Sequence, residues 1–137
     1  MPDPPVRFVL DSNIISRILR RDVRVASRLI DASKANARVY LCPVVYYEVR
    51  RGLLERGASR QLGEFDALAS TLIWEEFERP MWEGAASTWA DCRRRGRPHD
   101  DADLLIAAYA RHLQATLVTN NTADFEDLGL RLANWVM

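Results

Sequence analysis

Four carboxylates lie at or near the ends of predicted strands, where together they could hold a hard divalent cation. Asp11 follows the apolar run of FVLDSNIIS, and Glu48 lies in YYEVRRGL. Asp103 begins DLLIAAYA, and Asp124 lies in NNTADF. Ligand sets made only of oxygen atoms suit Mg²⁺ or Mn²⁺ rather than zinc. One or two such ions can activate water and stabilise the leaving oxygen in phosphodiester hydrolysis.

Neutral polar side chains accompany these carboxylates. Asn13 lies two residues after Asp11, and Thr119, Asn120 and Asn121 end the stretch TLVTNN. Hydroxyl and amide groups of this kind hydrogen-bond to metal ligands and orient them. We therefore expect these four residues to surround the carboxylates rather than to bind the ion.

Two of the carboxylates also have an ordinary explanation. Glu48 lies at the border of the buried stripe of its helix, where glutamates are commonly solvated. An acidic residue in a first turn, such as Asp103, complements the helix dipole. Asp100 and Asp101 compete for that role, so we assign Asp103 to the site and Asp100 or Asp101 to the cap. Whether Asp124 or Asp101 is a fourth ligand stays open.

The charged residues balance, with nineteen basic and nineteen acidic side chains, so net charge alone indicates no polyanionic partner. All basic residues except Lys34 are arginines, and two groups are close in sequence. One group consists of Arg93, Arg94, Arg95 and Arg97, and the other of Arg17, Arg20 and Arg21. Arginine forks suit phosphate oxygens, so we expect the first group to contact a nucleic-acid backbone. Solvated helix faces are the alternative explanation.

Strands and helices alternate along the chain, which predicts an α/β fold: a three-layer α/β/α sandwich around a short parallel sheet. The predicted strands are Val6–Leu10, Arg38–Cys42, Thr116–Thr119 and Leu130–Trp135. The predicted helices are Ser12–Arg21, Val23–Asn36, Val44–Arg56, Ser59–Ala69, Pro80–Arg95 and Asp103–Leu113. Thr71–Phe77 is ambiguous between strand and loop. Ligands of such sheets bind beyond the carboxyl ends of the strands, where Asp11 is expected.

Residues at helix ends and aromatic residues refine the predicted arrangement of helices and strands. Ser59 is expected to cap the helix that it begins, and Gly57 to end the helix before it. Core packing is the expected role of Trp89 and Trp135, since stacking on bases or lining a partner groove is rarer. Tyr46 and Tyr47 cannot both face inward from one helix, so one of them is expected to be exposed.

Residues 1–137 are expected to form a single domain without a membrane span or a secretory signal, and so to be cytoplasmic. Cys42 and Cys92 show no CxxC spacing and are predicted to be ordinary thiols without a metal or disulfide role. His99 and His112 are too few and too scattered in the sequence to predict a zinc site.

These stretches, in this order, resemble the PIN-domain family, specifically the VapC-type toxins of type II toxin–antitoxin systems. The matching segments are FVLDSNIIS, YYEVRRGL, DLLIAAYA, TLVTNNTADFEDL and LRLANW, which run nearly from end to end. The resemblance implies an α/β/α sandwich, which agrees with the alternation of elements. It also implies that Asp11, Glu48 and Asp103 match the acidic metal-binding triad.

The resemblance extends to residues around that triad, with one departure. Asn13 matches the polar residue that holds the first aspartate, and Thr119 the small hydroxyl residue at the end of the fourth strand. Many PIN domains have an acidic residue where this chain has Asn121. Asp124 is then the candidate for the fourth carboxylate, and the number of bound ions stays open.

The implied activity is Mg²⁺- or Mn²⁺-dependent endoribonuclease action that leaves a 5′ phosphate and a 3′ hydroxyl. The implied partners are structured RNA, a second copy of the chain in a homodimer, and a cognate VapB-like antitoxin. DNA would be bound only through the antitoxin complex. The departure at Asn121 motivates an alternative hypothesis, a catalytically silent module with the same fold that binds RNA or a partner without an ion.

Overall fold

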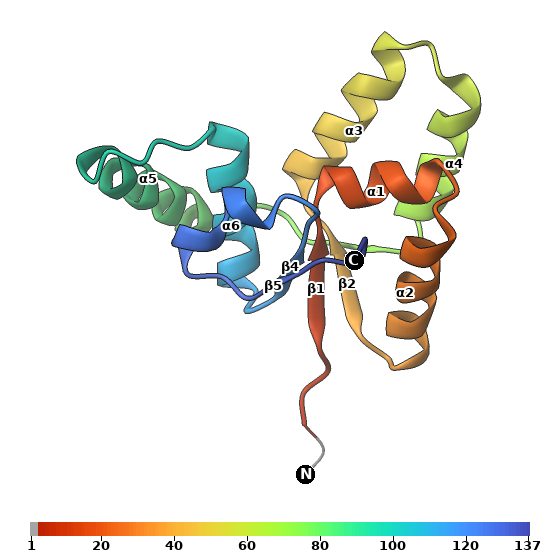
Figure 1. Ribbon diagram of the computed structural model, residues 1–137, viewed down its shortest axis with the longest axis horizontal. Helices are drawn as coiled ribbons and strands as arrows, with labels where there is room; N and C mark the ends of the chain where they lie inside the picture. The colour runs from red at the N-terminus through yellow and green to blue at the C-terminus, as the bar shows by residue number, and fades with distance from the viewer. Residues whose placement is uncertain (1–2) are drawn as a thin grey trace.

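A five-stranded parallel sheet forms the centre of the molecule in the computed structural model, which describes residues 3–137 (Figure 1). The strands are β1 (Arg7–Leu10), β2 (Arg38–Leu41), β3 (Ile73–Trp74), β4 (Thr116–Val118) and β5 (Leu132–Ala133). They are arranged in the order β3-β2-β1-β4-β5, and every neighbouring pair is parallel.

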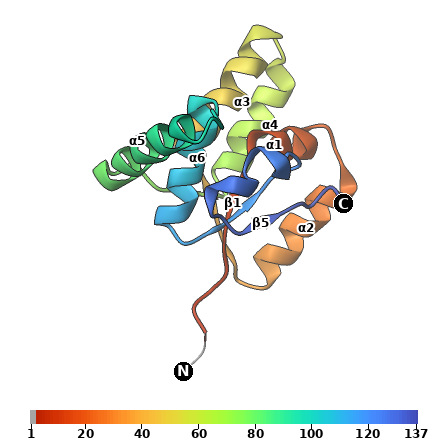
Figure 2. The ribbon, with the colours of Figure 1, turned by 60° about the vertical axis from the view of Figure 1, so that its left-hand side comes forward.

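Helices cover both faces of this sheet. The α-helices are α1 (Ser12–Leu19), α2 (Val23–Lys34), α3 (Pro43–Glu55), α4 (Ser59–Ala69), α5 (Arg79–Arg94) and α6 (Asp101–His112). Two short 3₁₀ helices, η1 (Thr122–Asp124) and η2 (Glu126–Leu128), connect β4 to β5. Figures 1 and 2 show α1, α2 and α4 on one side of the strands and α5 and α6 on the other. The predicted three-layer α/β/α sandwich is confirmed.

The central strands are apolar because both of their faces are covered. Val9 and Leu10 in β1 and Leu117 in β4 are fully buried. On the face of the sheet that α5 and α6 cover, α6 contributes Ile106 and Tyr109 to the same core. This packing holds the ends of β1 and β4 in the core, and the polar residues Asp11 and Thr119 directly follow these two strands.

The direction in which the chain adds strands reverses between β1 and β4. The chain first adds β2 and β3 on one side of β1, and then returns to add β4 and β5 on the other side. Crevices of parallel sheets open at such a switch point, beyond the carboxyl ends of the strands. Asp11 follows β1 directly and donates its backbone N–H to the Val118 carbonyl across this point, at 2.9 Å.

Most predicted elements are present, and their ends differ from the prediction by about two residues at most, as is usual for such boundaries. The ambiguous stretch Thr71–Phe77 contains the short strand β3. The predicted cap was wrong: Ser59 is the first residue of α4, its N-cap is Ala58, and no side chain caps this end. Gly57 ends α3 with a φ of 63°, as predicted.

The predicted packing of the aromatic residues was partly right. Trp135 is buried and lies edge-on against Phe8, with ring centroids 5.3 Å apart. Trp89 is 43% exposed, because it lies on the outer face of α5 under the Arg93 guanidinium. Of the tyrosine pair, Tyr47 is exposed, as expected for one of the two. Among residues 3–137, no helix has the length and apolar character required to cross a membrane.

Candidate active site

Asp11 is a buried carboxylate at the switch point of the sheet. It is only 5% exposed, and its position as N-cap of α1 places its side chain over the first turn of that helix. One carboxylate oxygen accepts the Ser12 backbone N–H at 2.8 Å. The other accepts the Thr119 hydroxyl at 2.8 Å and the Asn13 amide at 3.2 Å. These three donors compensate part of the cost of burying the charge.

A hydrogen-bond network joins the ends of β1 and β4 behind this carboxylate. The Asn13 amide donates to Thr119 Oγ1 at 3.2 Å, and its carbonyl accepts the Asn120 backbone N–H at 2.9 Å. Thr119 Oγ1 also accepts the Asn121 backbone N–H at 3.0 Å. Asn134 donates to the side-chain carbonyl of Asn120 at 3.2 Å. Asn13 and Thr119 thus act through their side chains, whereas Asn121 joins the network through its backbone.

Three carboxylates at this edge, Asp11, Glu48 and Asp103, have a raised pKa, mainly because they are buried. Burial raises the pKa of Asp11, and the hydrogen bonds from Thr119, Ser12 and Asn13 oppose that effect. Burial and then the charge of Asp11 raise the pKa of Glu48, which lies half-buried on α3. Burial raises the pKa of Asp103 to about 6, and the next contribution is repulsion by Asp11.

Asp124 lies in η1 and completes the set that we call the acidic edge: Asp11, Glu48, Asp103 and Asp124. Its charge contributes to the raised pKa of both Asp11 and Asp103, so it shares their electrostatic environment even though its side chain is exposed. Asp100, the N-cap of α6, also raises the pKa of Asp103, but its side chain makes no capping hydrogen bond. Asp101 is exposed in the first turn of α6 and lines an apolar groove beside α5.

The acidic edge gathers negative charge without bringing its carboxylates into one compact group. Within residues 3–137, no three of these four carboxylates bring ligand oxygens within 4.8 Å of one another. Burial is the main cause of the raised pKa values here, and repulsion between the carboxylates adds to it. The donor set consists only of oxygen atoms, which fits Mg²⁺ or Mn²⁺. A divalent cation at this edge would relieve the repulsion.

Two clefts share Glu48 of the acidic edge in their walls. A cleft of about 570 Å³ lies between α1, α3 and α4, and a second cleft of about 560 Å³ lies between α3, α5 and α6. Glu48 and Arg51 line both of them. The first cleft also contains Arg20 and Arg56, and the second is largely apolar, with Phe77 and Trp82 in its wall. Glu48 thus connects the acidic edge to both clefts.

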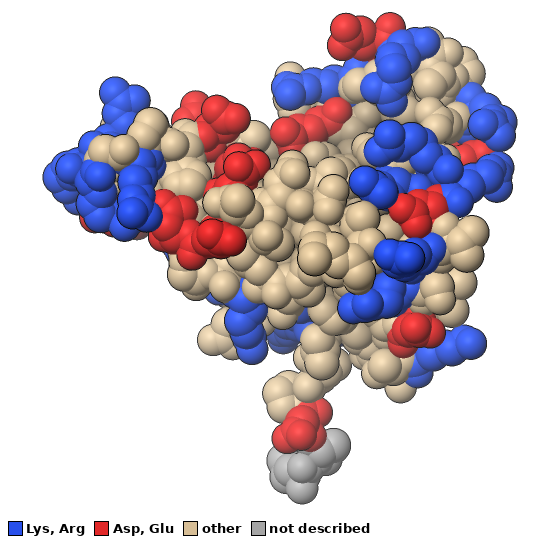
Figure 3. All heavy atoms as spheres, in the orientation of Figure 1, with Lys and Arg blue, Asp and Glu red and all other residues tan. Residues whose placement is uncertain are grey.

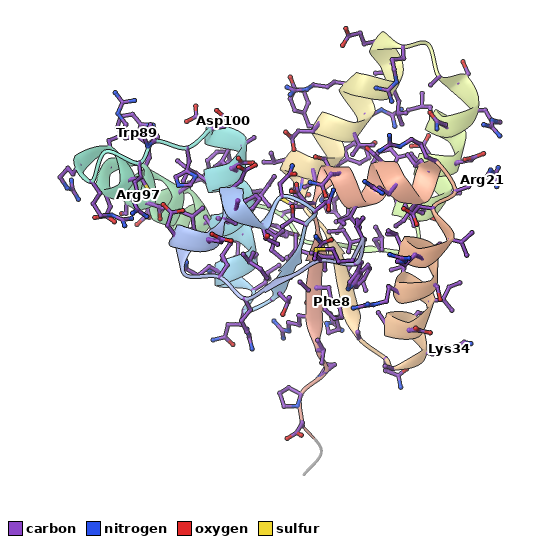
Figure 4. The ribbon with its side chains drawn as sticks, viewed as in Figure 1. Phe8, Arg21, Lys34, Trp89, Arg97 and Asp100 are labelled. Atoms are coloured by element: carbon purple, nitrogen blue, oxygen red, sulfur yellow. The ribbon has the colours of Figure 1, made fainter. Side chains whose placement is uncertain are left out.

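The four arginines predicted to contact a nucleic-acid backbone lie away from the sheet. Arg93 and Arg94 end α5, Arg95 is its C-cap, and Arg97 follows in the loop. They form a basic patch at the far end of α5, beside acidic side chains (Figure 3). Figure 4 shows Arg97 at this end of α5, with Asp100 at the start of α6. The structure places this group, which we call the arginine turn, outside the acidic edge.

Sequence reasoning missed two features around the site. The cleft arginines Arg51 and Arg56 are dispersed in the sequence, and only their helical spacing on α3 brings them beside Arg20. Cys92 and His99 were expected to have no metal role, yet they meet Asp127 in a compact group. No local motif joins these three residues, because they come from α5, the following loop and η2.

Comparison with protein families gives one extensive match. A family model described as the PIN domain matches residues 8–129, which include all four carboxylates of the acidic edge. Among curated relatives, the tRNA(fMet)-specific endonuclease VapC of Shigella flexneri is 27% identical over 134 residues. That alignment covers 95% of this chain and 98% of the relative. Ribonuclease VapC2 of Haemophilus influenzae is 25% identical, with 96% and 99% covered.

Solved structures share the fold over nearly the same length. A chain of VapBC2 from Rickettsia felis, bound to a DNA fragment from its promoter, superposes with a TM-score of 0.87. It is 24% identical, and the match covers 95% of this chain and 99% of that one. A chain of DNA-bound VapBC from Salmonella typhimurium gives a TM-score of 0.85 at 23% identity, with 95% and 98% covered.

Proposed function

The chain belongs to the PIN-domain family, and from this premise we propose that it is a metal-dependent endoribonuclease, the toxin of a type II toxin–antitoxin system. The observation that carries the proposal is the acidic edge. Asp11 lies buried at the switch point, held by three donors, and is electrostatically linked to Glu48, Asp103 and Asp124. The names of the relatives, VapC endonuclease and ribonuclease, support the same activity.

The four carboxylates of the acidic edge are the proposed ligands of Mg²⁺ or Mn²⁺. When bound, such an ion neutralises the phosphodiester and lowers the pKa of the attacking water. Asp11 is the central ligand because its hydrogen-bond donors favour the ionised form that a cation requires. Glu48 on α3 and Asp103 on α6 would supply further carboxylate oxygens to the ion. Asn13 and Thr119 fix the orientation of Asp11.

The RNA backbone is proposed to lie in the cleft between α1, α3 and α4. Arg20, Arg51 and Arg56 line this cleft, and Glu48 lies on its wall. Guanidinium groups in this position can neutralise the phosphates on both sides of the bond that is cleaved. The arginine turn is a second, more distant contact for the RNA backbone. Sequence-independent phosphate contacts of this kind give affinity rather than specificity.

The proposed protein partners are a VapB-like antitoxin and a second copy of the chain. The similar chains from Rickettsia felis and Salmonella typhimurium come from VapBC complexes bound to DNA, which supports an antitoxin partner and DNA contact through the complex. The apolar cleft between α3, α5 and α6 is the candidate protein-binding surface. Tyr47 and Trp82 are large and exposed there, which is typical of residues that become buried at interfaces.

The test is RNA cleavage by the purified protein, first freed of metal with EDTA and then supplied with Mg²⁺ or Mn²⁺. We expect cleavage only with an ion, and products with a 5′ phosphate and a 3′ hydroxyl. The control is D11N purified in the same way, because a contaminating nuclease would cleave equally in both samples. Ion-independent RNA binding by the wild type, without any cleavage, would contradict the proposal and support the silent binding module.

A further inference from the structure

A second group of metal-ligating side chains lies outside the acidic edge. Cys92, His99 and Asp127 each offer one ligand atom, and the three atoms lie within 4.8 Å of one another. Among the residues that the structure describes, this is the one group of three or more histidine, cysteine or acidic side chains so closely spaced. We call it the Cys–His–Asp cluster, and we propose that it is a Zn²⁺ site.

The end of α5 creates this cluster by turning the chain back on itself. Gly96 adopts a φ of 71°, and the Arg97 backbone N–H donates to the Cys92 carbonyl at 2.8 Å. His99 follows two residues later, in the loop between Arg97 and Asp100 (Figure 4). The Arg111 side chain donates to the Leu128 carbonyl and so connects η2 to α6. The turn thus brings His99 back towards Cys92, and η2 presents Asp127 to His99.

The donor set suits zinc and differs from that of the acidic edge. A thiolate, an imidazole and a carboxylate form a mixed sulfur, nitrogen and oxygen set, which zinc accepts in tetrahedral geometry. His99 Nε2 lies 3.1 Å from Asp127 Oδ2. Two ligands bonded to zinc at about 2.0 Å in a tetrahedron lie about 3.3 Å apart, close to this value. The fourth position would remain for water, since the described residues offer only three ligands.

The burial of the Cys92 sulfur excludes a large reactant. Cys92 is fully buried, whereas the side chains of His99 and Asp127 retain 12% and 18% exposure. An ion could therefore enter past the histidine, but a bulky electrophile could not reach the sulfur. An Arg95 guanidinium nitrogen lies 3.7 Å from Cys92 Sγ and donates to it. N–H donors support metal-bound thiolates in the same manner. The geometry thus favours metal ligation over use of Cys92 as a nucleophile.

An ion in the cluster would connect the arginine turn, the loop before α6 and the 3₁₀ segment that follows β4. Cys92 is beside the arginine turn, His99 precedes α6, and Asp127 lies three residues after Asp124 of the acidic edge. Zinc would thus fasten the arginine turn to the 3₁₀ segment between β4 and β5. This role does not depend on the proposed ribonuclease activity.

The test is titration of the full-length, tag-free protein with Co²⁺ as a spectroscopic substitute for Zn²⁺, followed by displacement with Zn²⁺. We expect one equivalent to give a thiolate-to-cobalt charge-transfer band that Zn²⁺ removes. C92S should abolish the band. H99Q and D127N should each weaken Zn²⁺ binding by about 100-fold or more. Loss of a group that only supports a ligand through a hydrogen bond costs less, about 10- to 100-fold. H99Q and D127N alter partly exposed side chains, so they remain informative if C92S fails to fold.

Matched controls come from the other cysteine and the other histidine. C42A and H112Q should keep the band and the affinity, because neither residue belongs to the cluster. Thermal melting should show stabilisation by Zn²⁺ for the wild type and these controls, but not for H99Q or D127N. Absence of a thiolate band in the wild type, or a band that C42A removes and C92S retains, would overturn the proposal.

Discussion

The acidic edge and the Cys–His–Asp cluster both gather titratable side chains from distant segments, but their electrostatics are opposite. At the acidic edge, burial and neighbouring carboxylates raise the pKa of Asp103 to about 6. In the cluster, the hydrogen bond from His99 lowers the pKa of Asp127. The first region gathers carboxylates that repel one another, whereas in the second the single carboxylate has a hydrogen-bond partner in His99. A cation would relieve repulsion in the first region, whereas in the second it would replace an existing hydrogen bond.

The difference also concerns the type of cation. Oxygen ligands at the acidic edge suit ions that keep several waters and share them with a phosphate. Sulfur and nitrogen ligands in the cluster suit an ion held by the protein itself. One chain can therefore offer an oxygen-only site and a separate site with mixed sulfur, nitrogen and oxygen ligands. The predictions below test whether the two regions are truly independent.

The largest expected effect is on cleavage by D11N. The substitution keeps a side chain that can cap α1 but removes the central negative charge of the acidic edge. We expect RNA cleavage in Mg²⁺ to fall by more than about 100-fold, because loss of a ligand exceeds the cost of losing its support. The measurement is the initial rate of cleavage, with circular dichroism to verify that the variant is folded.

Independence requires that the two regions respond separately. D11N should retain the thiolate-to-cobalt band, and H99Q should retain RNA cleavage within about threefold while it loses Zn²⁺ affinity, because distant sites are usually additive. Loss of both properties in either variant would show that the two regions form one functional unit.

T119V should have the next largest effect. Valine keeps the shape of Thr119 but removes the hydroxyl that donates to Asp11 and accepts from Asn13 and the Asn121 backbone. We expect cleavage to fall by about 10- to 100-fold, the usual cost of losing a group that orients a metal ligand. A higher Mg²⁺ concentration should restore part of the rate. T119S, which keeps the hydroxyl, is the matched control and should remain close to the wild type.

The raised pKa of Asp103 predicts an unusual pH dependence of stability in metal-free protein. Between the ordinary value of 3.8 and about 6, the folded state binds more protons than the unfolded state. The free energy of unfolding should therefore fall as pH rises through this window. The expected contribution is roughly 1 to 2 kcal/mol, after allowance for solvent screening of this half-buried group. Urea unfolding in EDTA, at about pH 4.5 and about pH 7, measures this difference in the free energy of unfolding.

Two comparisons isolate that contribution from the histidines, which titrate in a similar range. D103N should be less sensitive to pH than the wild type, because its amide carries no charge. Mg²⁺ at neutral pH should stabilise the wild type and leave D103N nearly unchanged. Equal pH profiles for the two proteins would show that repulsion at the acidic edge does not limit stability.

The sequence predicted the sheet and most helices because their signals are local. Apolar runs such as Val6–Leu10 and caps such as Gly57 depend on adjacent residues, and buried parallel strands have few alternatives. The errors lie where tertiary context decides. Trp89 has the large apolar side chain of a core residue, but it lies on the outer face of α5. Ser59 has the preferred chemistry for a cap, but the backbone begins the helix one residue earlier.

In the candidate site, too, the residues next to strands could be placed from the sequence, whereas those brought together by tertiary packing could not. Asp11 follows a strand, so its place at a sheet edge follows from topology, and Asn13 and Thr119 adjoin strand ends in the same way. The Cys–His–Asp cluster was not predictable, since it depends on a turn at Gly96 and on the packing of η2. Charge clusters in sequence were only a partial guide to the arginines of the cleft between α1, α3 and α4. Arg20 belongs to one such cluster, whereas Arg51 and Arg56 come from α3 and its C-cap.

The smallest expected effect distinguishes these two groups of arginines. If the cleft holds the RNA backbone, R56Q should weaken binding several-fold and reduce the salt dependence by about 0.7 to 0.9 per lost phosphate contact. R97Q in the arginine turn should change both quantities less, because it lies outside the cleft. R28Q on the exposed face of α2 is the control with the same change in charge. Fluorescence anisotropy with D11N, across a range of salt concentrations, measures binding without cleavage. A larger change for R97Q than for R56Q would move the RNA path from the cleft to the far end of α5.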